Sequence, residues 1–233
     1  MAIAFDSVGA VDPVGFVTNE ITWSHTNAGD LLLVGTSVSK PIADDVTGVT
    51  YNSIALTRIS QLEFSSYTVD WWYLLAPAIG TFDVVATAAT TPTDFFGASV
   101  SYTGAQQSGV PDDDDGGGTI GTAVTRTVTT VADNCWTVLA GMAGGGGAPL
   151  TAGAGSTERG ATLVGLSGTV PVFRLFDSDG AITPAGAYSM TFSCVGTQLI
   201  SAAMISFAPG ADVAAAVAGA YHLLLPRSRL REW

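Results

Sequence analysis

Residues 67–104 decide the fold, and they read YTVDWWYLLAPAIGTFDVVATAATTPTDFFGASVSYTG. Apolar and aromatic side chains recur at every second position from Val69 through Trp71 onward, which is the side-chain period of a β-strand. Two short segments rich in turn-forming residues, PAIG at 77–80 and TPTD at 91–94, divide the stretch into three strands. Because parallel strands need a long crossover, connections this short predict an antiparallel meander.

The same pattern returns later in the chain. Three later segments match three earlier ones in order: 172–176 with 71–75, 186–192 with 80–86, and 203–207 with 98–102. Two copies are fewer than a solenoid needs, but two similar sheets that face each other would account for them. The sequence therefore predicts an all-β domain over residues 1–210, folded as a two-sheet antiparallel sandwich.

Further strands are expected on both sides of this stretch, at 2–8, 17–25, 31–38, 46–51, 54–64, 119–131 and 135–142. The apolar run LLLVGTSV at 31–38 predicts a central strand, and the turn residues at 52–53 predict a hairpin. The longest irregular stretch, GAQQSGVPDDDDGGGT at 104–119, predicts an exposed loop. Small residues at 151–168 predict a loop or an edge strand.

The composition is poor in charge. Charged residues make up 12% of the chain, against about 25% in an average soluble domain. Either much of the surface contacts other protein, or the exterior is rich in Ser and Thr instead. The net charge of −12 argues against nucleic-acid binding, which needs clustered Lys and Arg. No signal peptide is visible, since the first residues carry neither a positive segment nor a long apolar one.

The chain changes character after residue 210. Asp212 is a good helix N-cap, and the Ala- and Leu-rich segment 213–225 predicts a short helix that Pro226 ends. This apolar run is shorter than the roughly 20 residues that span a membrane. An Arg-rich tail follows, so residues 211–233 are expected to form a separate docking unit. The residues expected to contact a partner are Leu223, Leu224, Leu225, Arg227, Arg229, Leu230, Arg231 and Trp233.

Few residues suggest a metal or cofactor site, and neither is predicted to be bound. Asp112 to Asp115, followed by three glycines, resembles the start of a calcium loop, but the twelfth position counted from Asp112 is Ala123, which lacks a ligand group. The stretch is therefore either a cation site or a solvated acidic loop. His25 and His222 lack the spacing of zinc ligands, so His25 is expected to be a surface residue or a hydrogen-bonded one.

Two pairs of residues leave alternatives open. Cys135 and Cys194 lie in predicted strands; they form a disulfide if they are neighbours, or two buried free thiols if they are not. Trp71 and Trp72 point to opposite faces of their strand. Either both faces belong to the core, or Trp72 is exposed and could stack on a sugar or fill a protein interface.

Catalytic motifs are missing from the sequence. No Gly-x-Ser-x-Gly elbow is present, and the glutamates at 20, 63, 158 and 232 are scattered singly. Glycosidases need two carboxylates close together, and two distant ones could still meet in the folded chain. The prediction is that the protein is not an enzyme.

Several short motifs occur in the same order as in a known family. They are LLLVGTSV at 31–38, GVTYNSIALT at 48–57, WYLLAP at 72–77, VSYTG at 100–104, AGAGST at 152–157 and ISFAP at 205–209. Over residues 1–210 this succession resembles the concanavalin A-like (LamG-like) jelly-roll domains of tailed-phage structural proteins and bacterial surface proteins. The resemblance implies a two-sheet jelly roll without a catalytic site, which serves as a capsid decoration, a tail or fibre module, or a glycan-binding module. It assigns no site residues and does not cover 211–233.

These observations lead to one main hypothesis, a non-enzymatic virion structural protein of a tailed bacteriophage that is made in the host cytoplasm and docks through 211–233. Capsid decoration and tail attachment both fit. The expected partners are other virion proteins or further copies of the chain, in a homo-oligomer or a large assembly, without nucleic acid or a membrane span. The alternative is a carbohydrate-binding module that recognises a receptor or a surface glycan.

Overall fold

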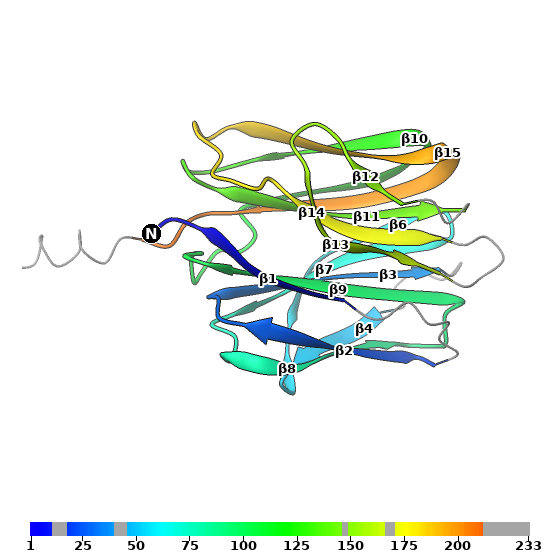
Figure 1. Cartoon of the computed structure of the whole chain (residues 1–233), viewed down its shortest axis with the longest axis horizontal. Coiled ribbons are helices and arrows are strands. Elements are labelled where there is room, and N and C mark those ends of the chain that lie inside the picture. Colours follow the sequence, from blue (N-terminus) through cyan, green and yellow to red (C-terminus); the bar gives the residue numbers. More distant parts are fainter. Residues whose placement is uncertain (11–17, 40–45, 146–148, 166–170, 212–233) are drawn as a thin grey trace, which may run out of the picture.

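The structure is a computed structural model, and it describes residues 1–10, 18–39, 46–145, 149–165 and 171–211 (Figure 1). Within these ranges the regular elements are β-strands, and every strand pair is antiparallel. The prediction of an all-β, antiparallel protein is confirmed. The predicted helix at 213–225 lies outside the described residues.

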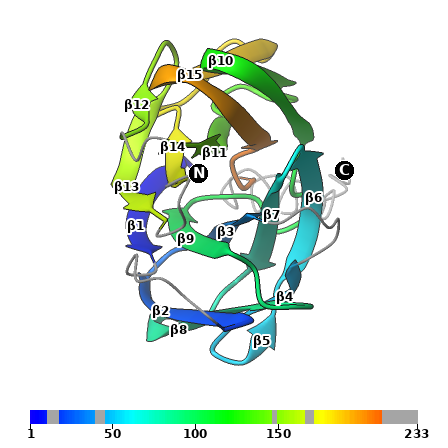
Figure 2. The ribbon, with the colours of Figure 1, turned by 90° about the vertical axis from the view of Figure 1, so that its right-hand side faces the viewer.

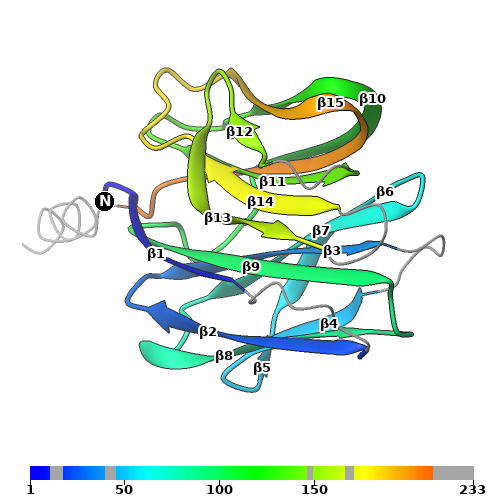
Figure 3. The ribbon, with the colours of Figure 1, turned by 45° about the vertical axis from the view of Figure 1, so that its right-hand side comes forward.

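The middle sheet contains, in spatial order, β1 (Ala4–Ala10), β9 (Asp94–Thr103), β3 (Leu31–Ser39), β7 (Tyr67–Leu75) and β6 (Thr57–Phe64). Every residue of β3 is buried, because the middle sheet lies between two other sheets, one on each of its faces (Figures 1 and 3). The prediction that the apolar run at 31–38 is a central strand is confirmed, since β3 lies between β7 and β9.

The lower sheet contains β2 (Glu20–Asn27), β8 (Gly80–Ala88), β4 (Val46–Tyr51) and β5 (Ile54–Ala55), in that order. Strand β2 alternates strictly between exposed and buried residues, which is typical of a sheet with one face in the core and one in water. The predicted hairpin at 46–64 is confirmed for its first part, β4 and β5. The chain then leaves this sheet, and β6 joins the middle one.

The upper sheet contains the two longest strands of the structure, which fold over its other strands (Figures 2 and 3). Its members are β10 (Asp113–Thr129), β15 (Ala187–Phe207), β11 (Trp136–Gly144), β14 (Val172–Asp177) and β13 (Thr157–Val164), with β12 (Thr151–Ala152) paired to β15. Strands β10 and β15 pair on both sides of an irregularity between Gly121 and Ala123, where the ribbon bends. The folded ribbon encloses a second apolar core, which includes Phe176 stacked on Phe192.

Two predictions about the arrangement of strands need correction. The described residues form three sheets rather than two. The three strands predicted in 67–104 are present, but they do not form a meander: β7 and β9 flank β3 in the middle sheet, and β8 belongs to the lower sheet. Each short connection crosses from one layer to the next, which allows apolar residues of all three strands to reach the core. Likewise, the segments 186–192 and 203–207 belong to one bent strand, β15.

Trp71 and Trp72 are both buried, so the first alternative for this pair is confirmed and Trp72 is not an exposed stacking platform. The Trp71 indole donates to the carbonyl oxygen of Ala203 in the upper sheet at 2.8 Å. The Trp72 indole donates to Thr36 Oγ1 at 3.2 Å within the middle sheet. The guanidinium of Arg58 lies 4.6 Å from the centre of the Trp72 ring, which adds a cation–π contact.

The predicted loop at 104–119 needs correction in its second part, because residues 113–119 belong to strand β10, while 104–112 connect β9 to β10. Strand β10 begins at Asp113 and pairs with β15 through all three glycines. Gly116 and Gly118 face β6, where an added Cβ would contact Leu62 or overlap the ring of Phe64. Gly117 faces the other way, and an added Cβ would lie 2.6 Å from Arg126 Nη1. Close packing therefore requires glycine at 118, whereas an added Cβ at Gly116 would make an ordinary contact with Leu62 and one at Gly117 would meet only the flexible end of Arg126.

We expect Gly118→Ala to destabilise the fold by about 1–3 kcal/mol, because the new methyl group would overlap the Phe64 ring and force the two layers apart. Gly48→Ala is the matched control, since an added Cβ there meets nothing within 4 Å. Chemical denaturation of both variants beside the wild type measures the difference. Equal stabilities for the two variants would contradict the packing assigned to Gly118.

Candidate functional site

The residues predicted to dock on a partner, Leu223 to Leu225, Arg227, Arg229, Leu230, Arg231 and Trp233, lie outside the described residues. The structure describes the point from which their segment starts. The N-terminus and the end of β15 meet at one end of the body (Figure 1). We call this end the terminal pole and define it by Met1, Ala2, Asn134, Pro209, Gly210 and Ala211.

Backbone hydrogen bonds fix the chain at the terminal pole. Residue Gln106 donates its amide to the carbonyl oxygen of Ala208 at 3.0 Å, and Gly210 donates to that of Gly104 at 2.7 Å. The Met1 ammonium donates to the carbonyl oxygen of Gly210 at 2.9 Å. At Gly104 the backbone has φ +74°, and a Cβ would overlap the carbonyl of Ala2, so this crossing point needs glycine. Residues 208–210 are therefore held between the N-terminus and the connection that follows β9.

The terminal pole encloses a hollow of about 570 Å³. Met1 contributes its ammonium group, and the other five lining residues have no ionisable side chain. The Asn134 side chain is already engaged, because its Oδ1 accepts a hydrogen bond from Thr183 Oγ1 at 3.2 Å. Backbone carbonyls and small side chains of this kind can receive a peptide segment, and the Met1 ammonium already donates to the carbonyl oxygen of Gly210.

Charge differs between the body and the segment that leaves the terminal pole. Residues 1–211 contain 18 Asp and Glu against five Lys and Arg, a net charge of −13. The remaining 22 residues contain three arginines against Asp212 and Glu232, a net charge of +1. Opposite charges of this kind favour contact between the arginines and an acidic body, either its own or that of a neighbouring copy.

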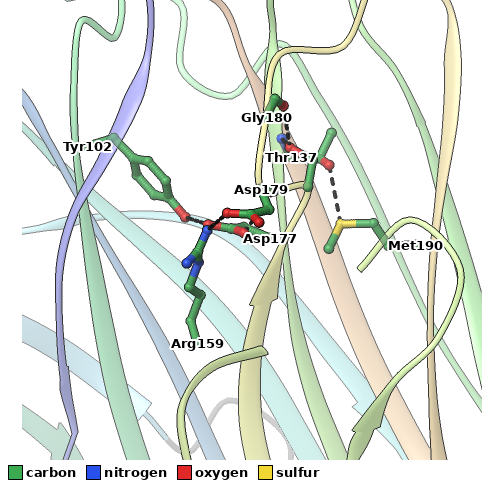
Figure 4. Close-up of polar contacts among 8 residues, drawn as sticks. Tyr102, Thr137, Arg159, Asp177, Asp179, Gly180 and Met190 are labelled. Carbon is green, nitrogen blue, oxygen red and sulfur yellow. Dashed lines mark hydrogen bonds and ion pairs between the residues drawn. The ribbon is translucent and has the colours of Figure 1, made fainter. Parts of the chain in front are cut away.

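A buried ion pair between β13 and β14 of the upper sheet is hydrogen-bonded to Tyr102 of the middle sheet (Figure 4). The Asp177 carboxylate is fully buried, and its Oδ2 accepts hydrogen bonds from Arg159 Nε at 2.6 Å and from the Tyr102 hydroxyl at 2.9 Å. Its Oδ1 accepts one from the Asp179 amide at 2.9 Å. Burial, and then the nearby Asp177 charge, raise the pKa of Tyr102 well above its usual value, so the phenol stays a donor. The buried polar groups of this cluster are thus paired with one another.

We expect Arg159→Met to cost about 3–5 kcal/mol of unfolding free energy, because it leaves the Asp177 charge buried without its cation. The control is Asp179→Asn, which removes the contact of Arg159 with a carboxylate that is 57% exposed and should cost less than about 1 kcal/mol. Denaturant unfolding measures both. A loss at Arg159 no larger than that at Asp179 would contradict a stabilising role for the buried Arg159–Asp177 pair.

His25 lies in a second buried network, between the lower sheet and the strands β1 and β9. Its Nδ1 is 2.9 Å from Ser99 Oγ, and its Nε2 is 3.0 Å from Ser101 Oγ. Ser101 donates to Asp6 Oδ2 at 2.6 Å, so its oxygen is left to accept from Nε2, and the imidazole is neutral with its proton on Nε2. Burial lowers the pKa of His25 to about 4, and the opposing effect of Asp6 is smaller.

The combination of Ser, His and Asp is also found in hydrolases, but here the geometry is structural. His25 is only 1% exposed, and both nitrogens of its ring lie within 3.0 Å of a serine hydroxyl. The imidazole is therefore shielded from solvent and would not meet a substrate in this conformation. The prediction that His25 is either at the surface or hydrogen-bonded is confirmed in its second form.

The His25 pKa predicts how stability depends on pH. Because the folded pKa of about 4 lies below the usual 6.5, the unfolded chain binds more protons between these values. This contribution to stability is complete above pH 6.5 and is lost as the pH falls to about 4, by about 3 kcal/mol. We expect His25→Gln to flatten the dependence between pH 7 and 4.5 in denaturant titrations. An unchanged slope in the variant would contradict a buried neutral His25.

Three of the four aspartates at 112–115 accept hydrogen bonds from protein groups, which corrects the expectation of a calcium loop or a solvated one. Asp113 and Asp115 accept hydrogen bonds from the backbone amides of Thr129 (2.6 Å) and Thr127 (2.9 Å), across the fold of their own strand. Asp112 accepts from Gln106 Nε2 at 2.7 Å and faces the Cys135 thiol at 3.5 Å. Among the described residues, no group of three or more His, Cys, Asp or Glu is suited to hold a metal ion.

Cys135 and Cys194 are both free thiols, which settles the alternatives left by the sequence. Cys135 is buried, and burial raises its pKa, so it is not an activated nucleophile. Cys194 is half-buried at the bend of the β10–β15 ribbon, and burial raises its pKa as well.

Comparisons with known proteins add little to this geometry. No protein-family model matches the chain. No curated protein matches it either. Among solved structures, a match is found to a "Biofilm associated protein - BSP domain", with 9% identity, a TM-score of 0.26, and coverage of 88% of this chain and 50% of that one. A TM-score this low carries no inference about function. In the described part of the chain, no helix has the length and apolar character needed to cross a membrane.

Proposed function

We propose that this chain is a non-enzymatic structural protein, held in a larger assembly by residues 212–233. The observation that carries the proposal is the construction of the terminal pole. There the last described residues are fixed by hydrogen bonds from Met1 and to Gly104, so the segment that follows starts from a defined point on a rigid body. A firmly held starting point reduces the entropy lost when such a segment binds a partner.

Two further features support a structural role over catalysis. The buried polar groups described above, around Asp177 and His25, have protein partners and are used for packing the layers together. The opposite charges of the body and the last 22 residues favour attachment between copies or to another acidic protein. Expected partners are therefore further copies of this chain or other proteins of the assembly.

The assembly that we propose is the virion of a tailed phage, in which the chain would be a capsid decoration protein or a tail-associated module. This part of the proposal rests on the resemblance of residues 1–210 to jelly-roll domains of such virions. The passage of β7, β8 and β9 from one sheet to the other and back supports a jelly-roll arrangement of the middle and lower sheets.

Truncation tests the proposal directly. We expect the full-length chain to self-associate and the chain ending at Ala211 to be a monomer with unchanged thermal stability, because residues between Ile3 and Phe207 supply two apolar cores. Light scattering coupled to size exclusion measures the two masses. A third sample, with Arg227, Arg229 and Arg231 all changed to Ser, separates the contribution of charge from that of the apolar residues. A truncated chain with the same oligomeric mass as the full-length one would contradict the proposal.

A further inference from the structure

Apolar side chains are exposed at the bend of the β10–β15 ribbon. Of the described residues, Val195 and Ile120 have the most exposed large apolar side chains, at 71% and 68%, and both lie at this bend. Ile120 is the cross-strand partner of Leu199, which is half-buried and packs against the main apolar core. Cys194 packs against the second core, so strand alternation places Val195 on the outer side of the ribbon. We call the surface of Ile120, Val195 and Leu199 the bend patch.

The bend patch lies in a part of the chain that has no charge. Residues 116–125 and 180–211, which form the bend and the strands that lead to it, contain no charged residue. The nearby edge of β10 is different, because the carboxylates of Asp113 and Asp115 accept hydrogen bonds from the amides of Thr129 and Thr127. Acidic side chains at a strand edge disfavour pairing with another chain. The edge is therefore protected, whereas the bend is left apolar.

The bend is held in shape by its own contacts. Gly196 has φ +74°, a backbone conformation that glycine adopts without strain. Gln198 Nε2 donates to the carbonyl oxygen of Val195 at 3.4 Å, and the Cys194 thiol donates to that of Gly121 at 3.8 Å. A partner would thus meet a surface that is already ordered, which lowers the entropic cost of binding.

The position of the bend indicates which partner can reach it. The bend and the terminal pole lie at opposite ends of the body (Figures 1 and 3). The segment 212–233 starts at the terminal pole, so a neighbouring copy placed end to end would bring its bend patch to this segment. Such a contact joins two different surfaces of the same chain and is a heterologous interface.

The chemistry of the segment complements the bend patch and its surroundings. The segment carries the apolar residues Leu223 to Leu225 and Trp233, together with three arginines. Exposed carboxylates are present on both strands that lead to the bend: Asp114 on β10, and Glu63 on β6, which packs against β10. An apolar surface with acidic residues on the neighbouring strands suits a segment that is apolar and basic.

We propose that residues 212–233 of one copy dock on the bend patch of the next, so that the chains assemble head to tail. This inference rests on the proposed function, in which the same segment holds the chain in an assembly, and it names the surface that receives the segment. The leucines and Trp233 cover Ile120 and Val195, and the arginines pair with Glu63 and Asp114. Repetition of this contact gives a ring if it closes and a filament if it does not.

The first test changes the bend patch in the full-length protein. Ile120→Thr with Val195→Thr keeps the β-branched shape and removes the apolar surface. We expect this double variant to associate at least about tenfold more weakly than the wild type, as measured by light scattering over a dilution series. Ile79→Thr is the matched control, because Ile79 is 67% exposed but lies in the connection between β7 and β8. It should keep the mass of the wild type, and melting temperatures check that all variants are folded.

A mixing experiment tests the direction of the contact. The double variant keeps the segment 212–233, and the chain ending at Ala211 keeps the bend patch. We expect the two to be monomers alone and to form a 1:1 pair when mixed, because each supplies the surface that the other lacks. The pair should not grow further, since its two ends have no matching surface left.

The outcomes separate this inference from the proposed function. A double variant with the mass of the wild type, or a mixture without a 1:1 pair, would overturn docking at the bend patch. The proposed function would stand in both cases, provided that the chain ending at Ala211 is smaller in mass than the full-length assembly. Equal oligomeric masses of the full-length and truncated chains would overturn both.

Discussion

The burial of the middle sheet on both faces is the constraint on which the rest of the structure depends. A strand such as β3, with no residue exposed, needs apolar cover from two directions. Trp71 and Trp72 are adjacent in β7 and contribute to this cover. The Trp71 indole is hydrogen-bonded to the upper sheet, and the Trp72 indole is hydrogen-bonded within the middle sheet. Gly35 on the same sheet makes room for Leu175 and Phe173 of the upper layer. The lower and upper sheets can therefore be seen as the two coverings that this central layer requires.

Much of the fold could be predicted from local sequence pattern, because the alternation of apolar and polar residues along a strand is visible in the sequence. The strands at 31–39 and 67–75 follow from their apolar runs, and the hairpin at 46–55 follows from its turn residues. Which strands pair could not be predicted in the same way. Short connections fit a meander and a crossing between layers equally well, and only long-range packing decides between them. That residues 187–207 form a single bent strand, β15, could not be predicted for the same reason, since the sequence at the bend resembles a turn between two strands.

The candidate sites, too, could be predicted from the sequence only in part. The acidic stretch looked like a loop because Asp and Gly disfavour strands on average, yet alternation was present: Asp113 and Asp115 lie on one face with Gly117, while Gly116 and Gly118 lie on the other. That signal could have been found. The clustering of His25 with Ser99 and Ser101 could not, because β2 and β9 are far apart in sequence.

The position of the terminal pole has a mechanical consequence. A partner that holds residues 212–233 would pull on the end of β15, the longest strand, which is hydrogen-bonded to β10 on one edge and to β11 on the other. A load applied along such a strand acts in shear, so that many ladder bonds must break together, whereas a load across its end would open them one by one. The body would thus resist unfolding under such a pull far better than the few hydrogen bonds at the terminal pole alone would suggest.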